Sequence, residues 1–349
     1  MTSCMLQPVR AVLAGAVIVL ATAALAGCSF QPEEKIWEIS GSVFGTSYHI
    51  DVVLNEDSSR LEELAAGIQS ELDDVDASMS TWRKDSELSQ LNSKPDQSEW
   101  TPLSEPLYEV LRKSEEVSRL TNGAFDVTVG PAVNLWGFGP DARPEHVPSD
   151  EVLAQVLARI GHEHLVLRAD PPAIRSDVPQ YIDLSGIAKG YGVDVVARYL
   201  DKQGVGAYLV EIGGEVRSRG RKPNGEVWRL AIEQPVSESR QVSRIIALDN
   251  RAMATSGDYR NYYESEGHRF SHTIDPVTGK PIAHNLASVT VIAEDCMTAD
   301  ALATGFNVMG FSQAKELATR ENIAVYFIVR TENGFEEHQT PAFSSYVIQ

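Results

Sequence analysis

Residues 205–248 read VGAYLVEIGGEVRSRGRKPNGEVWRLAIEQPVSESRQVSRIIAL, and they give the strongest indication of the fold class. Three segments within them, 205–212, 227–233 and 243–248, have the density of β-branched residues that is typical of strands. Strands that follow one another along the chain favour antiparallel pairing over a doubly wound sheet. The stretch therefore predicts an α+β protein with mostly antiparallel sheets and packed helices.

The rest of the chain supplies further strands and helices. Additional strands are expected at 36–54, with a break at Gly45, at 288–293 and at 323–330. From Ser59 onward apolar residues recur at helical spacing up to position 79, and Ser59 with Glu62 matches a capping box. Further helices are expected at 103–120, 149–160 and 186–203. Because no clean linker or internal repeat is evident, residues 36–349 are expected to form one catalytic unit of one or two lobes.

The N-terminal segment has the layout of a secretory signal. Arg10 is its only charge, residues 11–25 are almost wholly apolar, and the run ends in Leu25-Ala26-Gly27-Cys28. This pattern resembles a bacterial lipobox, which implies a signal peptide over 1–27, lipid on Cys28 and a short linker over 28–35. The chain would then be exported and lipid-anchored to a bacterial membrane, facing the periplasm or the cell exterior. An uncleaved anchor is disfavoured because the run is short for a membrane span.

Composition excludes several classes of function. With 43% hydrophobic residues and no low-complexity tract, the chain is expected to fold into a packed, enzyme-sized body. Its formal net charge of −19 disfavours binding to nucleic acid and electrostatic adhesion to anionic lipid. Of the three cysteines, Cys4 and Cys28 lie in the N-terminal segment, so Cys296 has no partner for an internal disulfide or a cysteine-type zinc site.

The segment Asp183-Leu184-Ser185-Gly186-Ile187-Ala188-Lys189-Gly190-Tyr191-Gly192 is a candidate phosphate site. Its glycines let backbone approach a ligand closely, Ser185 can cap the following helix, and the helix N-terminus with Lys189 offers positive potential to a phosphate. The same residues also suit an ordinary tight strand-to-helix turn. The spacing of a P-loop is absent.

A second candidate is the pair Asp300 and Thr304, four residues apart on an expected helix. Their oxygens would share one face, about a turn apart. Mg²⁺ takes a few oxygen ligands and keeps its waters, so it suits this pair better than a soft metal does. The alternative is an aspartate favoured by the helix dipole, with Thr304 bonding back to the helix.

Several polar turns complete the set of motifs. The segments 255–260 (TSGDYR) and 271–281 (SHTIDPVTGKP) contain Asp258 and His272, and His272 precedes a turn at an expected strand edge. A histidine so placed could serve as a general base, or it could simply cap a turn at the surface. A further compact polar turn is expected at 123–128. His162-Glu163-His164 is read as the solvated face of a strand, since no metalloprotease spacing accompanies it.

Together these motifs resemble the flavin transferases of the ApbE type. The matching segments, spread over nearly the whole mature body, are 44–46, 80–82, 86–92, 123–126, 183–192, 211–215, 255–260, 272–281 and 299–304. Members of this family take FAD, split its pyrophosphate and attach FMN through a phosphoester to a threonine or serine of a target protein. The resemblance implies that the acceptor is a threonine-bearing flavoprotein subunit of a membrane redox complex.

The resemblance also implies the site residues. Mg²⁺ would be held by Asp300, Thr304 and a backbone carbonyl at Gly186. The residues expected to bind FAD are Phe44, Trp82, Ala124, Phe125, Asp126, Asp183, Lys189, Ile274 and Met297. The family usually has a methionine where this chain has Phe44, often a tyrosine where it has Trp82, and often two adjoining histidines where it has Ser271-His272. If either of those histidines is catalytic, it must therefore be His272.

The expected reaction is displacement at the FMN-side phosphorus, with an acceptor hydroxyl attacking and AMP leaving. Mg²⁺ and Lys189 would cancel the charge that develops on phosphate oxygens, while His272 is the expected base and Asp258 the weaker candidate. If water replaces the protein hydroxyl, the same site becomes an FAD pyrophosphatase giving FMN and AMP. A non-catalytic FAD-binding lipoprotein is the third interpretation, and the metal pair argues against it because binding alone requires no ion on the pyrophosphate.

Overall fold

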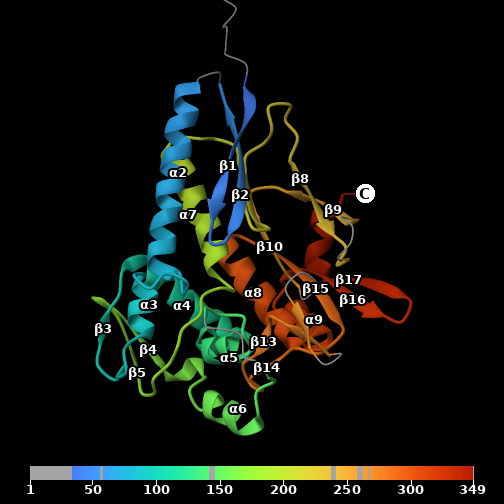
Figure 1. Ribbon diagram of the computed structural model, residues 1–349. Helices are drawn as coiled ribbons and strands as arrows, with labels where there is room; N and C mark the ends of the chain where they lie inside the picture. The colour runs from blue at the N-terminus through green and yellow to red at the C-terminus, as the bar shows by residue number, and fades with distance from the viewer. Residues whose placement is uncertain are drawn as a thin grey trace, which may run out of the picture.

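An antiparallel sheet of eight strands organises this computed structural model, which describes residues 34–55, 58–140, 146–236, 241–257, 262–265 and 268–348 (Figure 1). In spatial order the strands are β1 (Lys35–Val43), β2 (Thr46–Leu54), β6 (Tyr208–Ile212), β7 (Glu215–Arg219), β10 (Ala252–Gly257), β15 (Leu286–Ala293), β16 (Ala324–Thr331) and β17 (Gly334–Gln339). Every neighbouring pair runs antiparallel. This confirms the predicted α+β class with mostly antiparallel pairing.

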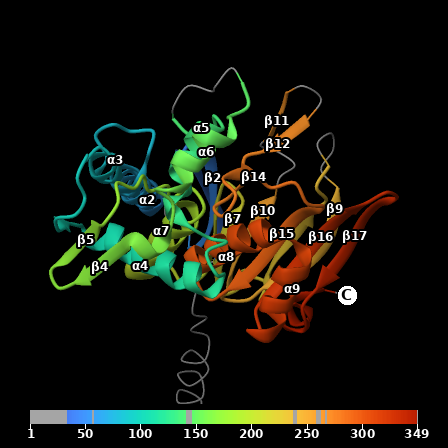
Figure 2. The ribbon, with the colours of Figure 1, turned by 90° about the horizontal axis from the view of Figure 1, so that it is seen from below.

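The two faces of the sheet carry different layers. Successive residues of a strand point to opposite faces, and in β10 Ala252 and Ala254 join the cores beneath the helices while Met253 joins the opposite core. The helical layer is formed by α2 (Ser58–Met79), α7 (Ala188–Lys202) and α8 (Cys296–Met309), which pack against one another and against the sheet. Figure 2 shows α8 beside β10 and β15.

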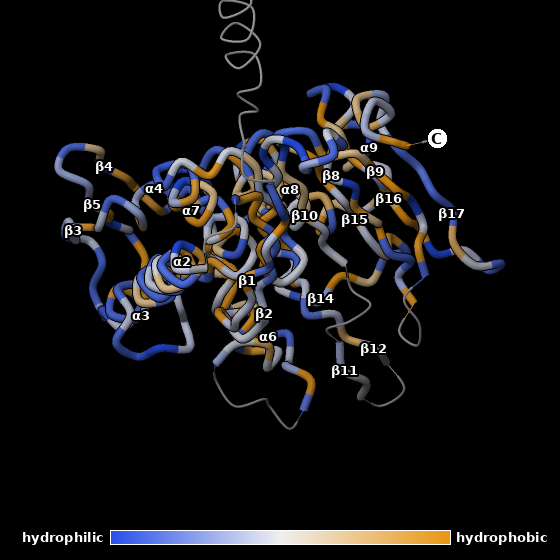
Figure 3. The backbone as a smooth tube through the Cα atoms, turned by 90° about the horizontal axis from the view of Figure 1, so that it is seen from above, coloured by the Kyte–Doolittle hydropathy of each residue, from blue (hydrophilic) through white to orange (hydrophobic). Residues whose placement is uncertain are grey.

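The opposite face is covered by a separate two-stranded ribbon. The ribbon consists of β8 (Trp228–Glu233) and β9 (Val242–Leu248), and η3 (Pro341–Tyr346) lies against β9 and β16. Their buried side chains, with those of the central strands, form one hydrophobic core. In Figure 3, α2 alternates between hydrophilic and hydrophobic positions, as expected for a helix at the edge of the protein.

Smaller elements surround these layers. The remaining helical segments are α3 (Glu87–Asn92), α4 (Glu105–Leu120), η1 (Val127–Val129), α5 (Gly130–Leu135), α6 (Asp150–Leu157), η2 (His162–His164) and α9 (Phe311–Arg320). The remaining strands are β3 (Thr101–Pro102), β4 (Leu165–Ala169), β5 (Pro172–Ser176), β11 (Tyr262–Ser265), β12 (His268–Ser271), β13 (Ile274–Asp275) and β14 (Lys280–Pro281). None of the helices in the described residues combines the length and apolar character needed to span a bilayer.

The structure confirms most of the predicted elements and corrects two details. The five strands predicted within 205–330 correspond to β6, β8, β9, β15 and β16, and the predicted helices correspond to α2, α4, α6 and α7. The predicted break at Gly45 in segment 36–54 is confirmed: Phe44 and Gly45 adopt positive φ angles of 52° and 74° and reverse the chain between β1 and β2. Helix α6 ends at Leu157, short of position 160. Residues 162–164, predicted to lie on a strand, form a 3₁₀ turn just before β4.

Candidate active site

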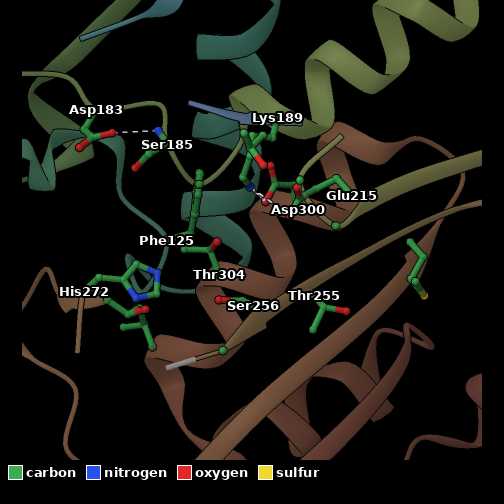
Figure 4. A pocket seen from close by; sticks show the side chains of 18 of the residues that line it. Phe125, Asp183, Ser185, Lys189, Glu215, Thr255, Ser256, His272, Asp300 and Thr304 are labelled. Atoms are coloured by element: carbon green, nitrogen blue, oxygen red, sulfur yellow. Dashed lines mark hydrogen bonds and ion pairs between the residues drawn. The ribbon is translucent and has the colours of Figure 1, made fainter. Parts of the chain in front are cut away.

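A cavity of about 730 Å³ lies where the β6–β7 turn, the start of α7 and one face of α8 meet (Figure 4). Its wall is built by residues from segments far apart along the chain: 46–47, 124–133, 183–189, 211–216, 230–233, 253–257, 272–276 and 300–308. Most of the motifs singled out in the sequence therefore converge on one cavity.

Most of the predicted site residues line this cavity. They are Ala124, Phe125, Asp126, Asp183, Gly186, Lys189, His272, Ile274, Asp300 and Thr304. Three predicted flavin contacts lie elsewhere: Phe44 packs against α7 at Gly192, Trp82 follows α2 with 70% of its surface exposed, and Met297 is buried in the core. Asp258 and Cys28 lie outside the described residues. The roles assigned to all these residues stay predictions.

Three charged side chains from three elements meet in the cavity wall. The Lys189 ammonium on α7 lies 3.0 Å from Glu215 Oε1 on β7 and 3.7 Å from Asp300 Oδ1 on α8. Both acids are almost fully buried, with exposed fractions of 3% and 4%. Burial lowers the pKa of Lys189, but Asp300 and Glu215 outweigh this effect and raise the pKa above its ordinary value. Burial, and to a lesser extent Asp300, raise the pKa of Glu215 above its ordinary value, although the neighbouring Lys189 ammonium opposes the shift and favours the carboxylate.

Close contact between α7 and α8 places Asp300. The Gly190 N–H donates to Asp300 Oδ2 at 2.9 Å. A Cβ at Gly190 would lie 2.4 Å from the carbonyl oxygen of Cys296, so the helices could not approach this closely with any other residue there. The glycines of segment 183–192 were expected to let backbone approach a ligand closely. At Gly190 the backbone instead approaches helix α8.

A buried carboxylate fastens the first turn of α8 to α7. Asp194 on α7 accepts the N–H groups of Cys296 and Met297 at 3.0 and 2.9 Å, and it pairs with Arg217 of β7. These N–H groups lie in the first turn of α8, where backbone N–H groups have no acceptor within their own helix. Asp194 thereby helps fix Asp300, one turn further along α8.

The polar turn at 123–128 is held together by Asp126. Its carboxylate accepts the N–H and hydroxyl of Thr128 at 2.8 and 2.6 Å and the N–H of His162 at 2.9 Å. Burial raises the pKa of Asp126, although these hydrogen bonds lower it. The bonds leave Asp126 a rigid, partly desolvated acceptor in the cavity wall.

The segment that precedes α7 is joined to that turn. The Asp183 N–H donates to the carbonyl of Val127 at 2.7 Å, and the Asp183 carboxylate accepts the N–H of Ser185 at 2.8 Å. Ser185 was expected to cap α7. The helix instead begins at Ala188 without a side-chain cap, because Ser185 lies too far before the first turn and belongs to the Asp183 turn.

His272 lies between β12 and β13, and not on a strand. His272 lines the cavity, and Figure 4 shows its ring on the side of the cavity where Thr304 and Ser256 lie. The ring of Phe138 contacts it edge-on, with centroids 6.4 Å apart. An imidazole in this place can exchange a proton with a bound substrate.

The residues proposed for magnesium fit such an ion. The described residues contain no group of three or more His, Cys, Asp or Glu side chains that could hold a metal. Asp300 and Thr304 lie one turn apart on α8, and a Cβ at Gly186 would lie 3.2 Å from Thr304 Oγ1, so the Gly186 backbone adjoins that hydroxyl. A carboxylate, a hydroxyl and a backbone carbonyl form the all-oxygen set that Mg²⁺ prefers.

Glu215 is the candidate that sequence reasoning missed. Gly213 and Gly214 both have positive φ angles, 61° and 105°, and their turn brings Glu215 back beside Ile212. The segment EIGGE is one of the segments that resemble the ApbE family, but no role was predicted for its second glutamate. An acid directly after a double glycine, between two strand-like segments, was the available signal.

Comparison with known proteins identifies the family. A family model described as the ApbE family matches residues 44–327. A Vibrio cholerae relative named FAD:protein FMN transferase is 46% identical over 324 residues, covering 93% of this chain and 96% of that protein. The solved structure of the flavin transferase ApbE from Vibrio cholerae has a TM-score of 0.82 at 45% identity, covering 90% of this chain and 99% of that one. The apo flavinyl transferase ApbE of Pseudomonas stutzeri has a TM-score of 0.82 at 39% identity, covering 89% and 96%. The chain therefore belongs to the ApbE family.

Proposed function

We propose that this chain is an FAD:protein FMN transferase, the activity for which its relatives are named. It takes FAD as substrate and transfers FMN from it to a target protein. The observation that carries the proposal is the convergence of Lys189, Asp300, Thr304 and His272 on one cavity of a size suited to a dinucleotide.

The transfer is a displacement at the FMN-side phosphorus. The acceptor hydroxyl, from a threonine or serine, forms a new phosphorus–oxygen bond while the bond to the bridging oxygen breaks, and AMP leaves with that oxygen. His272 takes the hydroxyl proton, with Asp258 as the weaker candidate. The ammonium of Lys189 stabilises negative charge that gathers on the phosphate oxygens.

The same wall would hold the cofactor. Asp300, Thr304 and the backbone carbonyl of Gly186 would hold Mg²⁺, which when bound supplies positive charge to the phosphate oxygens. The turns at 124–126 and Asp183 offer fixed polar groups to the nucleotide, and Ile274 offers an apolar surface. Phe44, Trp82 and Met297 remain candidate flavin contacts outside this wall.

The N-terminal sequence supports a proposal on location. A signal peptide over 1–27 and lipid on Cys28 would hold the enzyme at a bacterial membrane, facing the periplasm or the cell exterior. The acceptor would be a threonine-bearing flavoprotein subunit of a membrane redox complex. The net charge of −19 supports a lipid tether over electrostatic adhesion to an anionic surface.

The test is a mass measurement on the acceptor. The full-length protein in detergent is incubated with FAD, Mg²⁺ and an unmodified threonine-bearing subunit, and FMN is sought on the threonine. Asp300→Ala, or chelation of Mg²⁺, should remove most transfer. Glu294→Ala should behave as wild type, because Glu294 precedes the same helix but its side chain is 86% exposed.

Two results would redirect the proposal. Release of FMN and AMP with no mass added to the acceptor would indicate an FAD pyrophosphatase. Tight FAD binding with neither product would indicate a binding lipoprotein.

A further inference from the structure

We propose that Glu215 is a positioning residue for this reaction: its carboxylate holds the Lys189 ammonium away from Asp300 and so keeps Asp300 available to a cation. The inference rests on the proposed transferase function. It adds to that function a residue that acts through Lys189, not through contact with substrate.

The two acids do not share Lys189 equally. The ammonium lies 3.0 Å from Glu215 Oε1, which is a hydrogen-bonding distance, and 3.7 Å from Asp300 Oδ1, which is not. Lysine is a compact charge on a flexible stem, so the acid that bonds it decides where the charge is held. In this arrangement Glu215 bonds the ammonium, and Asp300 is only its neighbour.

Asp300 has one oxygen left for a ligand. Its Oδ2 accepts the N–H of Gly190 at 2.9 Å, and its Oδ1 faces Lys189. Among the described residues, Glu215 and Asp300 are the acids within ion-pair distance of Lys189. If Glu215 lost its charge, the ammonium would turn to Asp300 Oδ1, and both oxygens of Asp300 would then be engaged.

Glu215 is held by the sheet and not by the helices that carry the other two residues. It begins β7 directly after the Gly213–Gly214 turn and pairs with Ile212 of β6. Lys189 and Asp300 belong to α7 and α8. The sheet therefore fixes the position of Glu215, and the flexible side chain of Lys189 is held where Glu215 bonds it.

The second oxygen of Glu215 argues against a purely structural role. Oε2 is buried and has no hydrogen-bond partner among the described residues. Burying an acceptor without a partner destabilises the folded state, so a residue kept only for stability would be fully bonded. An acid retained at that cost is better explained by what it does to Lys189.

The test is a double-mutant cycle on the full-length protein. Glu215→Gln is made in the wild type and in Lys189→Met, and the dissociation constant of Mg²⁺ alone is measured by calorimetry. The Mg²⁺ concentration that gives half-maximal FAD turnover is measured beside it. Glu337→Gln is the matched control, since Glu337 also pairs with a cation, Arg244, but lies outside the cavity wall. Thermal unfolding verifies that each variant is folded.

We expect Glu215→Gln to weaken Mg²⁺ binding by roughly 10- to 100-fold, the usual effect of removing a residue that orients a metal ligand. In the Lys189→Met background the same change should alter binding by less than about 3-fold, because no ammonium remains to move. An equal loss in both backgrounds would mean that Glu215 acts directly through its charge, and it would overturn the inference. Unchanged binding in the wild-type background, or no Mg²⁺ binding by the wild type, would also overturn it. Failure of the wild type to flavinylate the acceptor would instead count against the transferase function, while the calorimetry still decides the role of Glu215.

Discussion

Replacing Asp194 by asparagine should lower the free energy of unfolding by about 3 kcal/mol. Breaking a buried ion pair from one side typically costs about 3–5 kcal/mol, because the remaining charge is left without a partner. Asp194 is 1% exposed and bonds two N–H groups of α8 as well as Arg217. Asparagine is uncharged and keeps one acceptor oxygen, so at least one N–H group of α8 would lose its partner and the Arg217 guanidinium would lose its counter-charge. The lower end of the range applies because the Arg217 side chain is 28% exposed and water can partly solvate it.

Urea denaturation followed by tryptophan fluorescence measures this cost. Asp201→Asn is the matched control, since Asp201 pairs with Arg219 and joins the same helix to the same strand, but their side chains are 37% and 49% exposed. An exposed pair contributes at most about 1 kcal/mol, so the control should stay close to wild type. Asp194→Asn should also lose FAD turnover, because α8 carries Asp300. Equal destabilisation by the two substitutions would refute the reasoning.

Four further outcomes can be measured. Gly190→Ala should destabilise the protein by about 1–3 kcal/mol and lower turnover, because its Cβ would meet α8. The control Gly206→Ala should do neither, because a Cβ there meets nothing within 4 Å. Equal melting temperatures of the two variants would contradict this prediction. His272→Ala should slow single-turnover transfer by roughly 10²–10⁴-fold with little change in FAD affinity; weakened binding with an unchanged rate at saturating FAD would rule out the base role. Cys28→Ser should release the chain from membranes, and a variant that still sediments with lipid would defeat the tether. For Asp126 the pKa is raised above 3.8, so its contribution to stability is full below that pH and is lost as pH rises through the pKa of the folded state. The stability of wild type relative to Asp126→Asn should therefore fall as pH rises through this range, and a difference that is independent of pH would contradict the prediction.

The sequence predicted the elements whose side chains follow a simple apolar period. Helix α2 and strand β6 bury regular apolar faces, strand β16 is a continuous apolar run buried on both faces, and the spacing of Asp300 and Thr304 correctly indicated a shared helix face. The proposed magnesium pair could be predicted locally because both residues belong to one helix.

Strands β7 and β10 were not predicted, because what stabilises them lies elsewhere in the sequence. In β7, with sequence EVRSR, Glu215, Arg217 and Arg219 pair with Lys189, Asp194 and Asp201 of α7, so a charged segment is tied to a neighbouring helix. In β10, small residues leave room for α8, which packs on this strand. From composition alone, β7 resembles a solvated turn and β10 resembles a loop. The pairing of Glu215 with Lys189 was not predicted either, because the two residues lie on different elements, β7 and α7.

The order of the strands also bears on how the chain matures. Strand β2 pairs with β6, and β7 with β10, across long intervening segments, so the sheet has high contact order and is expected to fold slowly. Asp300 and Thr304 come late in the sequence, so a nascent chain lacks the complete cavity until α8 has been synthesised. If the chain is exported, as proposed, and crosses the membrane N-terminus first, slow folding would keep it competent for translocation. Helix α8, which would cross late, would then complete the site only on the far side of the membrane, where the acceptor is proposed to lie.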